Sequence, residues 1–188
     1  TRYLKRILTD AEIEFVKKAK RTDAALWSFW ACKETAYKVL KKTFPDTAFI
    51  PGQWQVSFTK SRINYVEGEV VIPQRGSVFV RLYSNPDYVH CVGADNSSLL
   101  DKLDSGVEIL PEQETNPSVF VRQCLAQQLT ARFSLNLDNI EIRRITNNGE
   151  LQLPQIFVDG KTTDIDISLS HEGRFVAYAV RHEKILVI

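Results

Sequence analysis

One stretch of the sequence places two chemically useful side chains one helical turn apart. Residues 29–38 read Phe-Trp-Ala-Cys-Lys-Glu-Thr-Ala-Tyr-Lys, so that Glu34 and Lys38 share a face if this stretch is a helix. A carboxylate there can hold a hard cation or accept a proton, and an ammonium beside it can hold a phosphate. The same spacing also favours a solvated surface ion pair between the two side chains, so the stretch alone leaves both interpretations open.

A second stretch, residues 167–177, reads Ile-Ser-Leu-Ser-His-Glu-Gly-Arg-Phe-Val-Ala. His171 ends a strand-like run and stands before a turn, where an imidazole can reach a phosphate or a ribose. Ser170 could donate its hydroxyl to the same phosphate. A single histidine in a turn is also commonly inert, so the second stretch gains weight only beside the first.

Composition bounds the class of protein. The chain has 188 residues, of which 44% are hydrophobic and 25% charged, with a net charge of +1. These values predict an ordinary globular protein of one large or two small domains, and no overall charge that calls for nucleic acid or an anionic membrane. No apolar run approaches the roughly 18 residues that span a bilayer, and no signal-peptide pattern opens the chain.

The three cysteines, Cys32, Cys91 and Cys124, lack metal-type spacing. We therefore expect reduced thiols in a cytoplasmic protein. Cys32 precedes Lys33, which could suggest a nucleophile, but a cysteine on a helix flank is more commonly part of the core.

The first half of the chain predicts two helices followed by strands. Thr9 and Glu12 fit a capping box at the start of a helix that runs to about Lys20, and a second helix runs from near Asp23 to Lys42. The strand-like segments that follow are Trp54–Thr59, Ile63–Ile72, Val78–Tyr83 and Tyr88–Ala94.

The pattern then restarts after a segment rich in Ser, Asp, Gly and Pro. We expect a helix over Ser118–Phe133 and then strands over Ile140–Ile145, Leu151–Val158, Ile165–Leu169 and Arg174–Val180, with an Asn147-Asn148-Gly149 turn. This repetition predicts an α+β pseudo-dimer of two similar halves, each a long helix packed on a small antiparallel sheet. The expected parts are a first half over 1–95, a linker over 96–116 and a second half over 117–188.

Together the two stretches resemble the 4′-phosphopantetheinyl transferases, which move the phosphopantetheine arm of coenzyme A onto a carrier-protein serine. Phe29–Lys38 is similar to their Trp-x-x-Lys-Glu-x-x-x-Lys helix, and Ile167–Val176 to their Ser-His hairpin. The second helix and the duplicated hairpin favour similarity to the surfactin-type form, which has two halves and an active site in the cleft between them, although the order of the halves is swapped here. The resemblance covers nearly the whole chain.

The resemblance implies roles for five residues. Glu34 would bind Mg²⁺ and help to deprotonate the carrier serine, and Lys38 would contact the phosphates of coenzyme A. His171 and Ser170 would hold the 3′-phosphate or ribose. Ser118 would hold a phosphate at the start of the second-half helix, or else simply cap that helix. We further expect Glu34 and His171 to face one cleft between the halves.

Two departures from the family pattern keep a second hypothesis open. The family's metal-binding Gly-x-Asp strand would precede Arg6, and no residue before Thr1 supplies it; we expect that strand to lie upstream. The family's Gly-Lys-Pro loop reads Asn148-Gly149-Glu150 here, so its phosphate-binding lysine is absent or displaced.

The role of Lys33, the residue before Glu34, stays open at this point. Its side chain could serve packing, contact with the carrier protein or contact with the ligand.

The expected function is thus Mg²⁺-dependent transfer of phosphopantetheine from coenzyme A to an acyl or peptidyl carrier protein, with release of 3′,5′-ADP. The expected partners are coenzyme A and the carrier protein, with no nucleic acid and no membrane, and the expected state is a monomer. The first alternative is a non-catalytic module that binds coenzyme A or a carrier domain. The second is a structural interaction protein with chance motifs.

Overall fold

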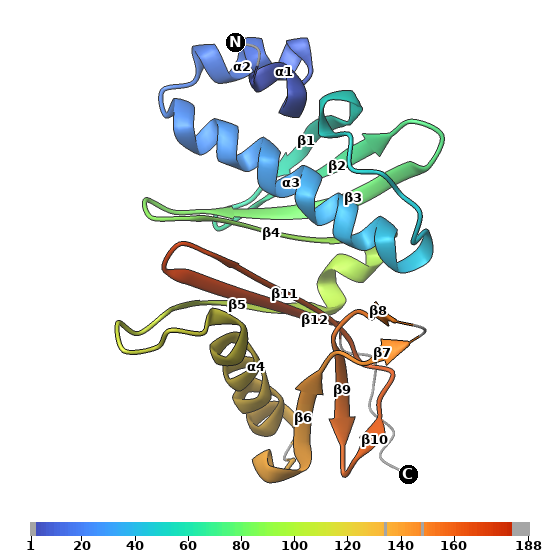
Figure 1. Cartoon of the computed structure of the whole chain (residues 1–188). Coiled ribbons are helices and arrows are strands. Elements are labelled where there is room, and N and C mark those ends of the chain that lie inside the picture. The colour runs from blue at the N-terminus through green and yellow to red at the C-terminus, as the bar shows by residue number, and fades with distance from the viewer. Residues whose placement is uncertain (1–2, 134, 148, 182–188) are drawn as a thin grey trace. The chain divides into compact units, whose positions relative to one another are not determined.

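The computed structural model describes residues 3–133, 135–147 and 149–181 of the chain. It divides into two compact units, Thr1–Asp101 (unit 1) and Lys102–Ile188 (unit 2) (Figure 1). Each unit combines helices with antiparallel strands, which confirms the predicted α+β class. Among the described residues, no helix is both long and apolar enough to cross a membrane.

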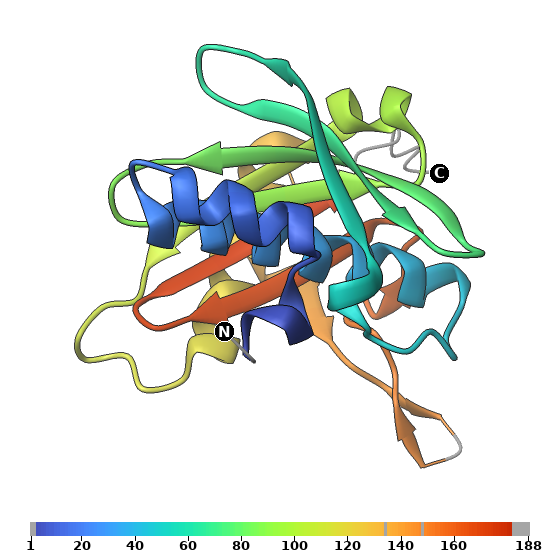
Figure 2. The ribbon, with the colours of Figure 1, turned by 90° about the horizontal axis from the view of Figure 1, so that it is seen from above.

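Unit 1 is one four-stranded sheet with three helices before it in the chain. The strands are antiparallel in the order β1-β2-β3-β4, and β1 and β2 continue into a long hairpin (teal in Figure 2). The elements are α1 Leu4–Ile7, α2 Asp10–Lys18, α3 Thr22–Thr43, η1 Pro51–Gln53, β1 Gln55–Ser61, β2 Val66–Ile72, β3 Gly76–Ser84 and β4 Val89–Ala94, followed by η2 Ser97–Lys102 at the boundary.

A local signal sets the beginning of α2. The hydroxyl of Thr9 accepts a hydrogen bond from the Glu12 backbone N–H at 3.3 Å, and the Glu12 carboxylate accepts one from the Thr9 N–H at 2.8 Å. This is the predicted capping box, and it starts α2. The second predicted helix is confirmed as α3.

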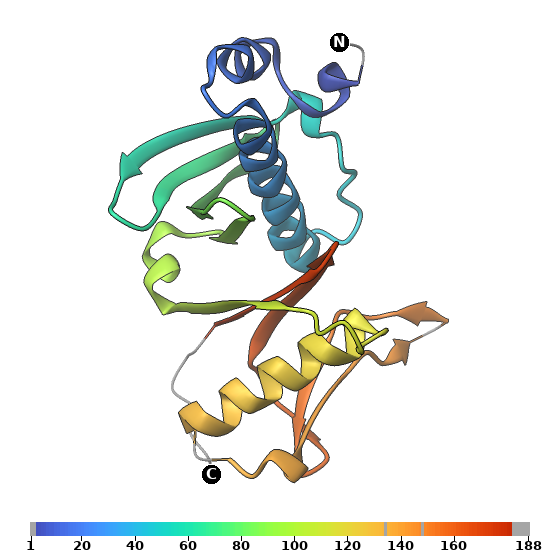
Figure 3. The ribbon, with the colours of Figure 1, turned by 90° about the vertical axis from the view of Figure 1, so that its left-hand side faces the viewer.

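Helix α3 runs along one face of the four-stranded sheet (Figure 3). Its buried stripe recurs every three or four residues and consists of Phe29, Cys32, Ala36 and Leu40. These side chains pack in one core with apolar residues of the sheet, including Val70, Val78, Val80 and Leu82. The face of α3 that carries Glu34 therefore points away from this core.

Unit 2 has one long helix and several small sheets. A three-stranded sheet has the order β11-β12-β5, a second the order β10-β9-β6, and β7 pairs with β8. The elements are β5 Leu103–Ile109, α4 Pro117–Phe133, η3 Leu137–Asn139, β6 Ile140–Arg143, β7 Thr146–Asn147, β8 Glu150–Leu151, β9 Gln155–Val158, β10 Lys161–Thr162, β11 Asp166–Glu172 and β12 Phe175–Arg181. The helix and the final hairpin lie where the sequence predicts them.

Two segments of the chain differ from their predicted form. The range 96–116, expected as a linker, contains β5, which pairs along its length with β12. Its Asp, Ser and Gly residues have low strand propensity, so the pairing comes from tertiary context. The strand expected over Leu151–Val158 is split at Pro154 into β8 and β9, because proline cannot donate a ladder hydrogen bond. Asn148 of the predicted turn lies outside the described residues.

Candidate functional site

Glu34 and Lys38 lie one turn apart on the outward face of α3, and both are half-buried. No ion pair or hydrogen bond engages either side chain among the described residues. The surface ion pair that their spacing also allows is therefore not formed. The two side chains offer a carboxylate and an ammonium that no described neighbour uses.

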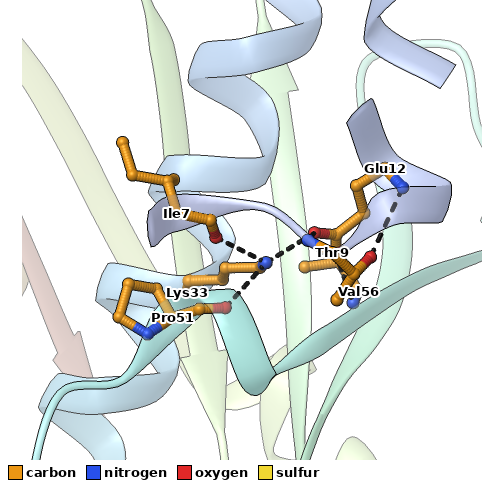
Figure 4. Close-up of polar contacts among 6 residues, drawn as sticks. All are labelled: Ile7, Thr9, Glu12, Lys33, Pro51 and Val56. Atoms are coloured by element: carbon orange, nitrogen blue, oxygen red, sulfur yellow. Dashed lines mark hydrogen bonds and ion pairs between the residues drawn. The ribbon is translucent and has the colours of Figure 1, made fainter. Parts of the chain in front are cut away.

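Lys33, the residue before Glu34, has a different environment. Its side chain is 0% exposed, and its ammonium is enclosed between three segments of unit 1 (Figure 4). The Nζ atom donates hydrogen bonds to the carbonyls of Ile7 and Pro51 at 2.8 and 2.9 Å. It also donates to Glu12 Oε2 at 2.5 Å. All three ammonium hydrogens thus have acceptors, and of the three roles open to Lys33 the structure supports packing.

Glu12 is 4% exposed, and both of its oxygens are used. Oε2 accepts from Lys33 and from the Thr9 backbone, while Oε1 accepts from the Val56 backbone N–H at 2.9 Å. Burial lowers the pKa of Lys33, and the hydrogen bond with Glu12 opposes that shift. The pair joins α2, α3 and the start of β1.

Thr35 fastens the other side of α3 to β4. Its hydroxyl donates to the Cys91 carbonyl at 3.1 Å. Its methyl group packs close to Gly93, where a side-chain Cβ would lie 2.8 Å from it. Glycine at position 93 therefore lets α3 approach the strand.

Cys32 is a core thiol, as predicted. It is fully buried, and its sulfur lies 3.9 Å from that of Cys91. The hydrogen bond with Cys91 and burial hold the pKa of Cys32 well above its usual range. A thiol that stays protonated is a poor nucleophile, so Cys32 does not supply one.

His90 on β4 is a titratable neighbour of the Glu34–Lys38 stripe that the sequence did not single out. Burial, with the nearby Lys38 ammonium, lowers the pKa of His90 to about 4. Its Nε2 is buried and has no hydrogen-bond partner among the described residues. His90 is therefore a neutral imidazole at neutral pH.

In unit 2, Ser170 and His171 are consecutive residues of β11. His171 is paired with Val176 and Ser170 with Ala177 across the hairpin. Because side chains alternate along a strand, His171 shares a face with Val176, which is 1% exposed in the core of unit 2, and Ser170 lies on the opposite face. His171 itself is exposed at the end of the strand. The structure does not bring these two predicted ligands to one face of the sheet.

Ser118 lies in the first turn of α4, but the cap of this helix is Asn116. The Asn116 side-chain oxygen accepts from the backbone N–H groups of Ser118 and Val119 at 3.1 and 3.2 Å. The hydroxyl of Ser118 instead accepts from the Arg122 guanidinium, one turn further along. The sequence signal for this cap is Asn116 followed by Pro117, since asparagine favours the N-cap and proline the first helical position.

The residues present fit a magnesium ion that arrives with a phosphorylated substrate. Among residues 3–133, 135–147 and 149–181, no three His, Cys, Asp or Glu side chains gather into a group that could hold a metal. Mg²⁺ is commonly held by one or two carboxylates, with substrate phosphates and waters as its other ligands. The unengaged carboxylate of Glu34, with Lys38 beside it for a phosphate, meets that minimum. Glu34 lies in unit 1 and His171 in unit 2, and their expected common cleft stays a prediction.

Comparison with known proteins finds a family similarity for the segment that carries Glu34 and Lys38. Residues 1–92 match the family model of the 4′-phosphopantetheinyl transferase superfamily. No curated protein and no solved structure matches the chain. The matched residues include all of α3 and reach into β4. The similarity to the 4′-phosphopantetheinyl transferase superfamily is therefore carried by residues 1–92, just under half of the chain.

Proposed function

We propose that this protein transfers the 4′-phosphopantetheine arm of coenzyme A to a serine of an acyl or peptidyl carrier protein. The observation that carries the proposal is the half-buried pair Glu34 and Lys38, unengaged by described neighbours, inside the segment that matches the superfamily. A carboxylate and an ammonium one turn apart suit a reaction in which a proton leaves a hydroxyl while charge develops on phosphate oxygens.

In this reaction the serine oxygen attacks the phosphorus that bears the pantetheine arm, and the bond from that phosphorus to the ADP oxygen breaks. The serine loses its proton, and 3′,5′-ADP leaves. Glu34 would accept that proton or orient the hydroxyl, and Lys38 would hold a phosphate of coenzyme A as a flexible point charge. A Mg²⁺ ion held by Glu34 would supply charge neutralisation to the pyrophosphate.

Unit 2 would bind the nucleotide end of coenzyme A. The exposed His171 is suited to the 3′-phosphate, and we assign Ser170 a contact with the same substrate from the other face of its sheet. Ser118 would take part together with Arg122, whose guanidinium adds a positive charge at the start of α4. The proposal requires Glu34 and His171 to contact the same coenzyme A molecule.

The test is incubation of the protein with coenzyme A, Mg²⁺ and an apo-carrier protein, read by the intact mass of the carrier. The expected result is a mass gain of one phosphopantetheine on the carrier, which a carrier with alanine in place of its acceptor serine does not show. An unmodified carrier under conditions in which an established transferase modifies it would refute the proposed function.

The second candidate is a module that binds coenzyme A or a carrier domain without transferring the arm. It is favoured by Glu150, which stands where the family has a phosphate-binding lysine. Calorimetry separates the candidates, because binding of coenzyme A without any mass gain on the carrier would support the module. Carrier binding without coenzyme A binding would do the same for a carrier-domain module.

A further inference from the structure

Two polar side chains hold α3 from opposite sides, one before and one after Glu34. Successive helical residues are rotated by about 100°, so Lys33 and Thr35 lie about 200° apart and Glu34 lies midway between them. Lys33 is fastened to the helical segments that precede β1, and Thr35 is fastened to β4. Glu34 thus lies between two residues that hold the helix in place; we call Lys33 and Thr35, with their contacts, the bracket.

The Lys33 side of the bracket joins four places in the chain. Its acceptors are the last residue of α1, a residue of α2 and the first residue of η1 (Figure 4). The Glu12 carboxylate then extends the network to the start of β1. Because the lysine side chain is fully buried and all of its donors are engaged, α3 cannot rotate or slide without breaking these bonds.

The Thr35 side of the bracket is short and tightly packed. The hydroxyl of Thr35 is bound to the Cys91 carbonyl, and its methyl group lies against Gly93. Hydrogen bonds on both flanks define one rotational setting of the helix, whereas apolar contacts alone tolerate small rotations. Because Glu34 and Lys38 lie on the same helix, the rotation of α3 also fixes the direction in which their face of the helix points.

A buried ion pair is an inefficient source of stability. Removing two charges from water costs about as much as their attraction returns, and apolar pairs of similar volume often stabilise a protein equally well. The Lys33–Glu12 pair is therefore best explained by the geometry that it imposes. Placement of a catalytic carboxylate is that kind of requirement, since a displacement of about 1 Å can cost about 10²-fold in rate.

We propose that Lys33, through its ion pair with Glu12, and Thr35 are positioning residues that set the rotation of α3 and thereby the place of the Glu34 carboxylate. The inference rests on the proposed transfer function. Lys33 adjoins Glu34 in the sequence, but in this proposal Lys33 does not contact the substrate.

The test separates stability from rate by replacing the whole ion pair. The double variant Glu12→Leu/Lys33→Met leaves no buried charge, although the backbone groups that the pair engages lose their partners. We therefore expect it to fold cooperatively and to lose less stability than Lys33→Met alone. We expect kcat for carrier modification to fall about 10- to 100-fold at saturating coenzyme A. A folded double variant with unaltered kcat would show that the pair is only structural.

Thr35 provides a second variant pair that perturbs the fold less. Thr35→Val keeps the shape and removes the hydroxyl, and we expect kcat to fall several-fold. Thr35→Ser keeps the hydroxyl and should restore kcat to near that of the unaltered protein. Equal kcat values in Thr35→Val and the unaltered protein would overturn the Thr35 half of the inference.

Chemical labelling checks the placement of Lys33 without any assay of activity. With an amine-reactive ester and peptide mass spectrometry, we expect Lys33 to stay unmodified in the native protein while the half-buried Lys38 reacts. Labelling of Lys33 at the rate of Lys38 would contradict its placement. Absence of transfer by the unaltered protein would refute the proposed function, whereas transfer with an unaffected double variant would overturn the positioning role alone.

Discussion

Lys33 and Glu34 are neighbours in the sequence, yet α3 places them in opposite environments. The Lys33 ammonium is fully buried with three acceptors, while the Glu34 carboxylate is half-buried and unengaged by described residues. The interior charge is thus satisfied by the fold itself, whereas no described residue engages the outward charge. The difference shows that a Lys-Glu motif on a helix need not present both charges to one substrate.

The largest expected effect is on the transfer rate, and it comes from replacing Glu34. Glu34→Gln keeps the size of the side chain and removes its charge and its basicity. We expect transfer to fall by about 10²- to 10⁴-fold, the usual scale for a lost acid–base or metal-assisting group. The free energy of unfolding should change by less than about 0.5 kcal/mol. Rates come from carrier mass spectrometry and stability from urea unfolding; near-normal transfer would return Glu34 to an ordinary surface role.

On the interior side, Lys33→Met should act mainly on stability. It leaves the Glu12 carboxylate buried without its counter-ion and removes the donor for the carbonyls of Ile7 and Pro51. We expect a loss of about 3–5 kcal/mol in the free energy of unfolding, measured with urea. The matched control is Lys20→Met, at an exposed lysine, which should cost less than about 0.5 kcal/mol. A comparable, small cost in both variants would contradict the network in Figure 4.

Lys38 allows two lysines of α3 to be compared directly. It lies on the same face of the helix as Glu34, whereas Lys33 is buried. Lys38→Gln should weaken coenzyme A binding by about tenfold, which corresponds to about 1.4 kcal/mol for one lost phosphate contact. Stability should be unaffected, unlike in Lys33→Met. Calorimetric titration with coenzyme A provides the affinity, and Lys20→Gln is the control for overall charge. If both variants bind coenzyme A as the unaltered protein does, Lys38 does not contact the substrate.

The smallest effect concerns the capping box that supports Glu12. Thr9→Ala removes the hydroxyl that accepts from the Glu12 N–H, and leaves the Glu12 carboxylate and its bonds in place. We expect a loss of about 1 kcal/mol by thermal or urea unfolding, and Thr9→Ser should recover it. A loss as large as that of Lys33→Met would show that the cap and the ion pair act as one unit.

Local signals in the sequence were enough to predict α2, α3, α4 and the final hairpin. The capping box at Thr9 and the turn that follows His171 each act over a few residues. The residues of the Lys-Glu helix were identified in the same way. Their assignment to roles came from the family resemblance, and the roles of Glu34 and Lys38 remain proposals.

Interactions between distant segments were not predictable in this way. Strand β5 exists because β12 pairs with it, and its own residues read as a loop. The Lys33–Glu12 ion pair joins residues 21 positions apart and is completed by two backbone carbonyls. The one available signal was Lys33 itself, which lies next to Cys32 and Ala36 at the edge of the buried stripe, where an unpaired lysine would be costly.

The most direct test of this account measures transfer rate and unfolding free energy in parallel for Glu34→Gln and Lys33→Met, with coenzyme A, Mg²⁺ and an apo-carrier protein. We expect Glu34→Gln to lose at least about 10²-fold in rate with normal stability, and Lys33→Met to lose about 3–5 kcal/mol of stability. A Glu34→Gln variant that modifies the carrier at the normal rate would contradict the central claim that the outward face of α3 carries the chemistry.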